Sequence, residues 1–75
     1  MLYNNKTAEN NFSYHKPGPD DEPKYHALRA RAKNLAKQII KLCPESREKS
    51  LALTNLEQAI FWANASIARN TKEEK

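Results

Sequence analysis

The feature that most constrains this chain is a series of apolar residues spaced alternately three and four apart. Its members are Tyr25, Leu28, Ala32, Leu35, Ile39 and Leu42. Because an α-helix has about 3.6 residues per turn, this spacing lines them up along one side of a single helix. It predicts a long helix over about residues 22–42, with an apolar seam for a partner helix. Pro23 suits the first turn, where no N–H is needed, and the acidic run Asp20–Glu22 suits the positive helix end better than it suits catalysis.

The segment CPES ends this helix and starts another. Pro44 disfavours a helical conformation for Cys43, while Ser46 is a favourable N-cap with Glu48 in the first turn behind it. A second apolar series then continues to about Asn70. Its members are Leu53, Leu56, Ile60, Ala63 and Ile67. Two long helices joined by a short loop predict an all-α fold, an antiparallel two-helix hairpin.

Three large apolar residues, Leu51, Phe61 and Trp62, lie outside the apolar side of the second helix. In an isolated hairpin each aromatic side chain would expose about 150–250 Å² of mostly apolar surface. A chain of 75 residues with a single cysteine has a small core and no internal disulfide to support it. We therefore expect a homo-oligomer in which these rings contact other copies. The alternative is that the N-terminal arm folds back over them.

The segment before the hairpin is polar, and the breaker cluster KPGPDDEP holds the single glycine and three of the four prolines. We expect residues 1–22 to form an arm with a short helix near Leu2–Ala8 and a Pro-rich loop. The hairpin follows over residues 23–70, and residues 71–75 form a frayed tail. No apolar segment is typical of a signal peptide or long enough to span a membrane, so we expect a soluble intracellular protein.

Residue patterns typical of catalysis are missing from the sequence. It contains no Gly-rich phosphate loop, no paired-His metal motif and no nucleophile elbow. Cys43 with two histidines makes a poor zinc-ligand set, and a small apolar role explains it better. We therefore expect no enzyme, no metal site and no cofactor.

Four cations follow one another at i, i+4 on the first helix, away from its seam and next to His26. They are Arg29, Lys33, Lys37 and Lys41. Such a stripe can neutralise phosphates, although most charge runs are only solvated surface. The net charge of +4 is too modest to decide between the two interpretations.

The segment FSYHK precedes a Pro-rich turn that can return it toward the cations Lys24, Arg29 and Arg31. Aromatic rings that stack on bases, next to cations that bind phosphates, suit a nucleotide ligand. The alternative is that Phe12 and Tyr14 only fasten the arm to the helices.

The elements FSYHKP, KYHALRARAK, CPESREKSLALTNLEQAIFWAN and SIAR occur in this order. Together, over about residues 12–70, they closely resemble the small phage proteins that act as cyclic-nucleotide sponges against CBASS immunity, the second anti-CBASS family. The resemblance implies a helical-hairpin protomer assembled into a compact hexamer. It also implies that cyclic dinucleotides such as cyclic GMP-AMP, and often cyclic trinucleotides at separate sites, are bound without cleavage. The expected location is the host bacterial cytoplasm, with neither long nucleic acid nor membrane as a partner.

The resemblance also carries roles onto single residues. It implies that Tyr14 stacks on a base of the dinucleotide, with His15 beside it in the same motif. Arg29, with Arg31 near it, is then the basic position that contacts phosphate or base. For the trinucleotide site, near a threefold axis, the resemblance implies Arg69 together with a residue of the arm. We place that arm residue at Thr7.

Two other functions fit the composition. The first alternative is a basic helical oligomer that binds DNA or RNA, whose affinity falls steeply with salt. The second is a hairpin that only contacts other proteins. A sponge differs from both because it holds a small cyclic ligand stoichiometrically.

Overall fold

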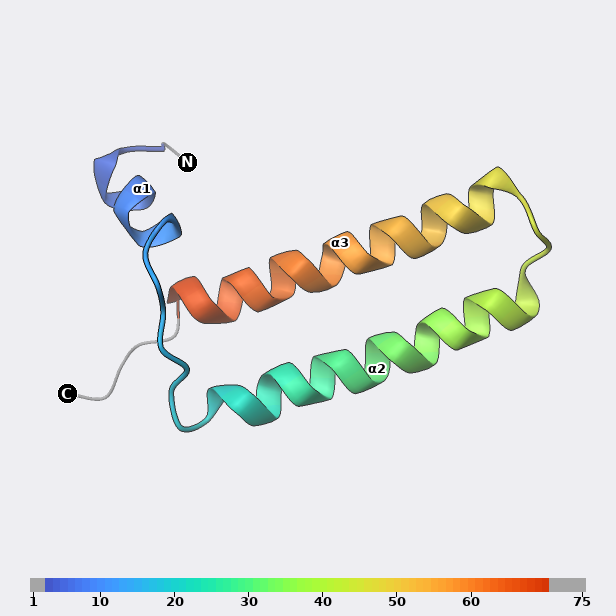
Figure 1. The fold of residues 1–75 in the computed structure, drawn as a ribbon, viewed down its shortest axis with the longest axis horizontal. Coiled ribbons are helices and arrows are strands. Elements are labelled where there is room, and N and C mark those ends of the chain that lie inside the picture. The colour runs from blue at the N-terminus through green and yellow to red at the C-terminus, as the bar shows by residue number, and fades with distance from the viewer. Residues whose placement is uncertain (1–2, 71–75) are drawn as a thin grey trace.

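The computed structural model describes residues 3–70, which fold into three helices and no strands. Helix α1 spans Asn5–Asn11, α2 spans Asp21–Leu42 and α3 spans Arg47–Asn70. Figure 1 shows α2 and α3 side by side and antiparallel, with α1 near the C-terminal end of α3. The predicted all-α helical hairpin is therefore confirmed, and both long helices begin and end within one or two residues of the expected positions. The expected frayed tail lies outside the described residues.

The start of α2 is anchored by Asp21, the only buried residue in the described part of the chain, with 3% of its surface exposed. Its Oδ2 accepts a hydrogen bond from the Gly18 N–H at 2.9 Å, and its own N–H donates to the Gly18 carbonyl at 3.1 Å. The preceding Asp20 makes no side-chain cap. The acidic residues here thus do more than favour the helix dipole, because one of them holds the loop against the helix.

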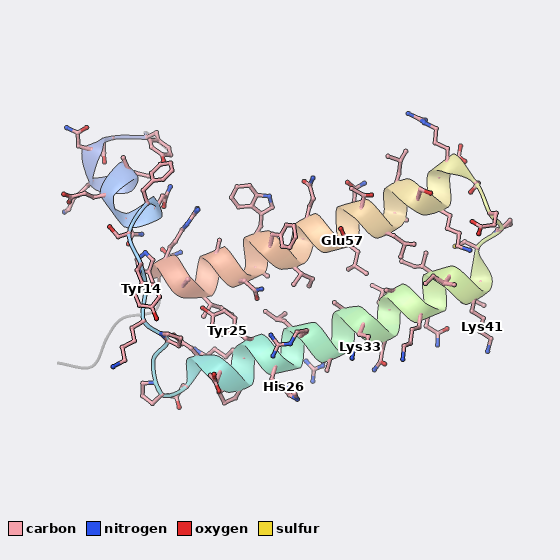
Figure 2. The ribbon with its side chains drawn as sticks, viewed as in Figure 1. Tyr14, Tyr25, His26, Lys33, Lys41 and Glu57 are labelled. Atoms are coloured by element: carbon pink, nitrogen blue, oxygen red, sulfur yellow. The ribbon has the colours of Figure 1, made fainter. Side chains whose placement is uncertain are left out.

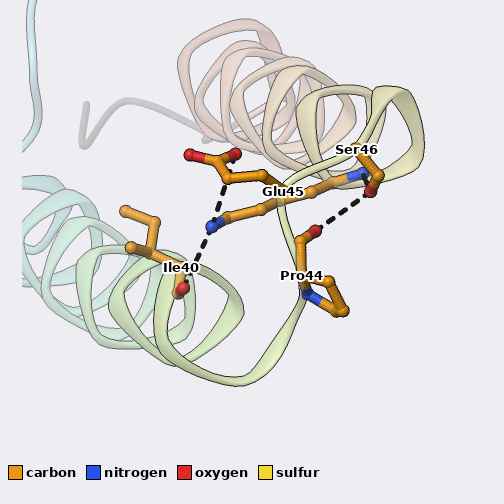
Figure 3. Close-up of polar contacts among 5 residues, drawn as sticks. Ile40, Pro44, Glu45 and Ser46 are labelled. Atoms are coloured by element: carbon orange, nitrogen blue, oxygen red, sulfur yellow. Dashed lines mark hydrogen bonds and ion pairs between the residues drawn. The ribbon is translucent and has the colours of Figure 1, made fainter.

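The turn between the long helices forms as its sequence predicts. Cys43 ends α2 in an extended conformation. The Ser46 hydroxyl accepts from the Lys49 N–H and donates to the Pro44 carbonyl, both at 3.1 Å, so Ser46 is the N-cap of α3. The Lys49 ammonium donates to the Ile40 carbonyl at 3.1 Å and lies 3.7 Å from a Glu45 carboxylate oxygen. Figure 3 shows how these contacts join the two helix ends.

The apolar seam of α2 is less regular than the sequence predicts. Leu28 is half-buried, but Leu35 is 50% exposed and Leu42 is 70% exposed. A strict seven-residue repeat drifts by about 20° per heptad around a straight helix, so its later members rotate away from the partner helix. Ala36 is half-buried instead. The expectation that Leu35 and Leu42 pack in the seam is therefore wrong for a single protomer.

The seam of α3 is half-buried along its length, but Phe61 and Trp62 are 66% and 65% exposed. The alternative that the N-terminal arm folds back over these rings is therefore wrong within a protomer. Within residues 3–70 no apolar side chain is fully buried. The hairpin alone leaves much apolar surface without a partner.

None of the helices in the described chain combines the length and the apolar composition needed to cross a membrane.

Candidate functional site

The segment between α1 and α2, residues 12–20, crosses the open end of the hairpin (Figure 1). Here it is called the connecting segment. Its two aromatic rings, Phe12 and Tyr14, are each 85% exposed. Rings that fastened the arm to the helices would be covered, so that interpretation is wrong for the protomer. Both rings are free to meet a ligand or another copy.

The connecting segment is held at its middle by His15, which is half-buried. The Nε2 atom of His15 lies 2.6 Å from the Asn10 carbonyl oxygen. Because a carbonyl oxygen only accepts hydrogen bonds, we assign the proton to Nε2. In the neutral ring Nδ1 is then an acceptor.

A second hydrogen bond holds the same segment near its C-terminal end, where the Asp21 carboxylate accepts from the Gly18 N–H. A Cβ on Gly18 would stand 3.4 Å from the bonded carboxylate oxygen. The other oxygen of Asp21, Oδ1, is buried and has no hydrogen-bond partner among the described residues. The exposed Tyr14 ring thus projects from a short loop that is fixed on its C-terminal side.

An open hollow lies between the first turns of α2 and the C-terminal half of α3. The residues around it are Glu22, Pro23, Tyr25, His26, Arg29 and Asn64. Arg29 and His26 are exposed, and the buried Oδ1 of Asn64 has no partner within residues 3–70. Figure 2 shows Tyr14, Tyr25 and His26 at the same end of the molecule. Arg29, the Tyr25 ring and the Asn64 amide offer a cation, an aromatic surface and hydrogen bonds to a ligand, while the Glu22 carboxylate beside them disfavours an anion on its side of the hollow.

Arg29 and Arg31 do not form one cationic cluster in the protomer. Both are exposed residues of α2, but a separation of two residues turns the helix by about 200°. Arg29 borders the hollow, and Arg31 lies on the opposite flank of the helix. The placement of Arg31 near Arg29 at one site stays a prediction, and within one chain the two side chains leave α2 in nearly opposite directions.

The basic stripe is fully exposed along α2 (Figure 2). No carboxylate in the described chain forms an ion pair with any of its four cations. These charges start at Arg29, beside the hollow, and continue toward the turn. The four charges can attract an anion. A surface of cations that are only hydrated by water would look the same in a single protomer.

Arg69 lies where α1 meets the end of α3. Its guanidinium carbon stands 5.9 Å from the centroid of the Trp62 ring, within cation–π range. Its carbonyl oxygen accepts a hydrogen bond from the Asn10 side-chain amide at 3.0 Å. The end of α3 is thus tied to the arm.

Thr7 is part of the N-terminal cap of α1. Its N–H and its hydroxyl donate to the Asn4 side-chain oxygen at 2.9 Å and 3.1 Å. It lies one helical turn before Asn10, which contacts Arg69. Thr7 and the residue that contacts Arg69 therefore belong to the same short helix, and the Thr7 hydroxyl oxygen is left as an acceptor.

Sequence reasoning missed Asn10, Asn64 and the holding role of Asp21. A polar arm with several asparagines gives no signal for which of them makes a tertiary contact. Asn64 follows the aromatic pair of α3, and nothing in the sequence marks it as a residue that lines a hollow. Among residues 3–70, no group of three or more His, Cys, Asp or Glu side chains is placed to hold a metal ion.

No curated protein and no solved structure matches this chain. A family model described as "Acb2/Tad1, hairpin domain" matches residues 4–68, from the cap of α1 almost to the end of α3. The match includes the connecting segment, both long helices and the turn between them. The chain therefore belongs to the Acb2/Tad1 hairpin-domain family, the family of anti-CBASS sponges.

Proposed function

We propose that this protein binds cyclic oligonucleotide second messengers and sequesters them without cleaving them, which blocks CBASS antiphage signalling in the cytoplasm of the host bacterium. Cyclic dinucleotides such as cyclic GMP-AMP are the first ligand class, and cyclic trinucleotides are the second. The observation that carries the proposal is the exposed Tyr14 ring on its anchored segment, before the start of α2, in a chain of this family.

In the dinucleotide site, the Tyr14 ring stacks on a base. Base–aromatic stacking contributes about 1–3 kcal/mol per base and tolerates any base. Arg29 binds a phosphate, and its planar guanidinium can donate two hydrogen bonds to one phosphate group. His15 offers Nδ1 to the ligand, because Nε2 is occupied by the Asn10 carbonyl.

A cyclic dinucleotide has two bases and two phosphates, so a site between two protomers matches it well. Each protomer then contributes one Tyr14 ring and one Arg29 side chain. Arg31 lies on the opposite flank of α2 and reaches such a site only from a neighbouring copy. This assignment is consistent with the positions of the two arginines on one helix.

In the trinucleotide site, Arg69 binds phosphate or base, and Thr7 joins it from α1. The bond from Asn10, one turn after Thr7 on α1, to the Arg69 carbonyl supports the pairing. Placement near a threefold axis would present three copies of each residue to a ligand with three phosphates.

The assembly that we propose is a homo-oligomer, a hexamer. The support for it is apolar surface that one hairpin leaves uncovered, above all Phe61, Trp62, Leu35 and Leu42. Burying such side chains against other copies is favourable by about 25 cal/mol for each Å² of apolar area.

The runner-up function, binding of DNA or RNA, rests on the unpaired stripe of cations on α2. A thermal-shift panel separates the two. A ligand that binds only the folded protein raises its melting temperature, by the equivalent of about 2.7 kcal/mol at a concentration 100 times Kd. We expect stabilisation by cyclic GMP-AMP and a cyclic trinucleotide but not by their linear forms. Stabilisation by duplex DNA or single-stranded RNA instead, lost as salt rises, would contradict the sponge function.

A further inference from the structure

Asn10 makes the side-chain hydrogen bond that joins the arm to the end of α3. Its side-chain amide donates to the Arg69 carbonyl at 3.0 Å, and its own carbonyl oxygen accepts a hydrogen bond from His15 Nε2 at 2.6 Å. Within residues 3–70, the Asn10–Arg69 bond is the single side-chain hydrogen bond between α1 and the two long helices. Asn10 therefore touches both a residue assigned to the trinucleotide site and one assigned to the dinucleotide site.

We propose that Asn10 is a positioning residue, which docks α1 on the end of α3 and thereby fixes the Tyr14–His15 segment relative to Arg69. It holds both proposed ligand sites in place without touching either ligand. This inference rests on the proposed function for its effect on affinity, whereas the docking of α1 is measurable without any ligand.

The α3 side of the contact follows from helix geometry. The last four carbonyl groups of a helix have no partner within the helix. Arg69 is the penultimate residue of α3, and its carbonyl takes a donor from outside the helix. The Asn10 amide supplies that donor. It keeps the last turn of α3 ordered, and with it the guanidinium that lies over Trp62.

The arm side of the contact follows from the length of α1. A helix of seven residues is not stable alone. Forming its first turn is unfavourable in free energy, and so short a helix adds too few hydrogen bonds to offset this. Its Asn4 cap orders its first turn, but docking must hold the rest. Once α1 is docked, the Asn10 carbonyl has a fixed position. The hydrogen bond from His15 to this carbonyl then fixes the middle of the connecting segment.

The substitution Asn10→Asp removes the side-chain contact of position 10 without removing its backbone contact to His15. It has almost the same shape as asparagine but cannot donate a hydrogen bond, and its charge is unfavourable at the negative end of α3. The backbone carbonyl that binds His15 is retained. The matched control is Asn11→Asp, which makes the same chemical change one residue later. The Asn11 amide donates to the Tyr3 hydroxyl within the arm and not to α3.

The first experiment measures amide hydrogen exchange across α1 in the full chain without ligand. We expect faster exchange in α1 for Asn10→Asp, an intermediate rate for Asn10→Ala and the parent rate for Asn11→Asp. Sedimentation and circular dichroism establish that each variant keeps its assembly and helix content. If Asn10→Asp does not stay folded, Asn10→Ala takes its place. Parent-like exchange in the folded Asn10 variants overturns the proposal.

The second experiment measures Kd for cyclic GMP-AMP and for a cyclic trinucleotide by titration calorimetry. The net contribution of one hydrogen bond corresponds to about a 2- to 10-fold change, and we expect that loss of affinity for both ligands in Asn10→Asp. Asn11→Asp should stay within about twofold of the parent. A parent protein that binds neither ligand contradicts the proposed function, and the exchange result still decides whether Asn10 docks α1. Parent-like affinities for both ligands in a variant with faster exchange overturn the link to the sites.

Discussion

The Arg69 guanidinium lies over the ring of Trp62, 5.9 Å from its centroid, one residue before the end of α3. Trp62 is the only tryptophan in the chain and is mostly exposed. Its fluorescence therefore reports directly on the position of Arg69, one of the residues that we assign to the trinucleotide site.

We predict that a cyclic trinucleotide changes the Trp62 fluorescence. Binding of the ligand by Arg69 competes with the cation–π contact, which is worth about 0.5–1 kcal/mol where Trp62 is exposed, as in the protomer, and about 2 kcal/mol where assembly removes it from water. A cyclic dinucleotide, bound at the Tyr14 end of α2, should leave the emission close to that of the free protein. Fluorescence titration with each ligand measures the difference.

Arg69→Lys is the control for this prediction. Lysine keeps the charge but loses the planar, two-pronged geometry, so trinucleotide affinity should fall while dinucleotide affinity stays the same. An unchanged emission at saturating trinucleotide would show that Arg69 does not leave Trp62 on binding. Equal trinucleotide affinity in Arg69→Ala would remove Arg69 from the site.

The turn between the helices gives a stability prediction. Ser46→Ala removes the N-cap of α3 and should lower the free energy of unfolding by about 1 kcal/mol. Ser50→Ala, in the exposed first turns of α3, is the matched control and should be neutral or slightly stabilising because alanine favours helices. Thermal melts at one fixed protein concentration compare the two, since assembly couples stability to concentration. Equal melting temperatures would mean that Ser46 is not an effective cap.

The hairpin was predictable because its signals are local. Apolar spacing, Pro44 and Ser46 each act over a few residues, and they agree on where α2 ends and α3 begins. The same local reasoning failed for Leu35 and Leu42. Residues seven apart are rotated slightly around a straight helix, and counting heptads ignores this rotation. The resemblance places Arg31 near Arg29, and because their positions on one helix point them apart, a shared site must draw them from different copies.

The tertiary contacts of the arm were not predictable. The Asn10–Arg69 bond joins residues 59 positions apart, and no periodicity links them. Asp21 was recognised as an acidic residue near a helix start, yet its burial and its bond to Gly18 depend on how the Pro-rich loop folds. For the ligand-binding roles, a family resemblance supplied what residue patterns did not.

The exposed rings of α3 give a prediction about assembly. Phe61→Asp should convert the proposed oligomer into smaller species, because a buried unpaired carboxylate is far less favourable than a phenyl ring in an apolar contact. Phe61→Leu keeps an apolar side chain and should keep the parent mass. Sedimentation velocity at micromolar concentration measures both. A parent protein that is a stable folded monomer would refute the oligomer outright.

We also predict that a bound cyclic nucleotide is released intact. A sponge needs only to hold its ligand, and the groups at the proposed sites are rings, cations and amides. Ligand incubated with the protein, recovered by denaturation and separated by chromatography should remain cyclic. Linear product that forms in proportion to protein concentration would show turnover instead.

The sharpest test of the dinucleotide site compares two rings on one loop. Tyr14 and Phe12 are equally exposed, two residues apart on the connecting segment, and neither supports the hairpin. We predict that Tyr14→Ala weakens cyclic-dinucleotide binding by about 5- to 150-fold for one stacked base, and by more if a site between protomers uses two rings. Phe12→Ala should stay near the parent affinity.

Arg29→Ala should weaken the same binding through a lost phosphate contact, whereas Lys41→Ala, at the far end of the same stripe, should not. Calorimetry on all four variants, with sedimentation to verify the assembly, separates stacking from general charge. If Tyr14→Ala and Phe12→Ala bind equally well, the ring does not stack on the ligand. If Arg29→Ala and Lys41→Ala weaken binding equally, the cations act as a uniform field along α2, and the site is not built around Arg29.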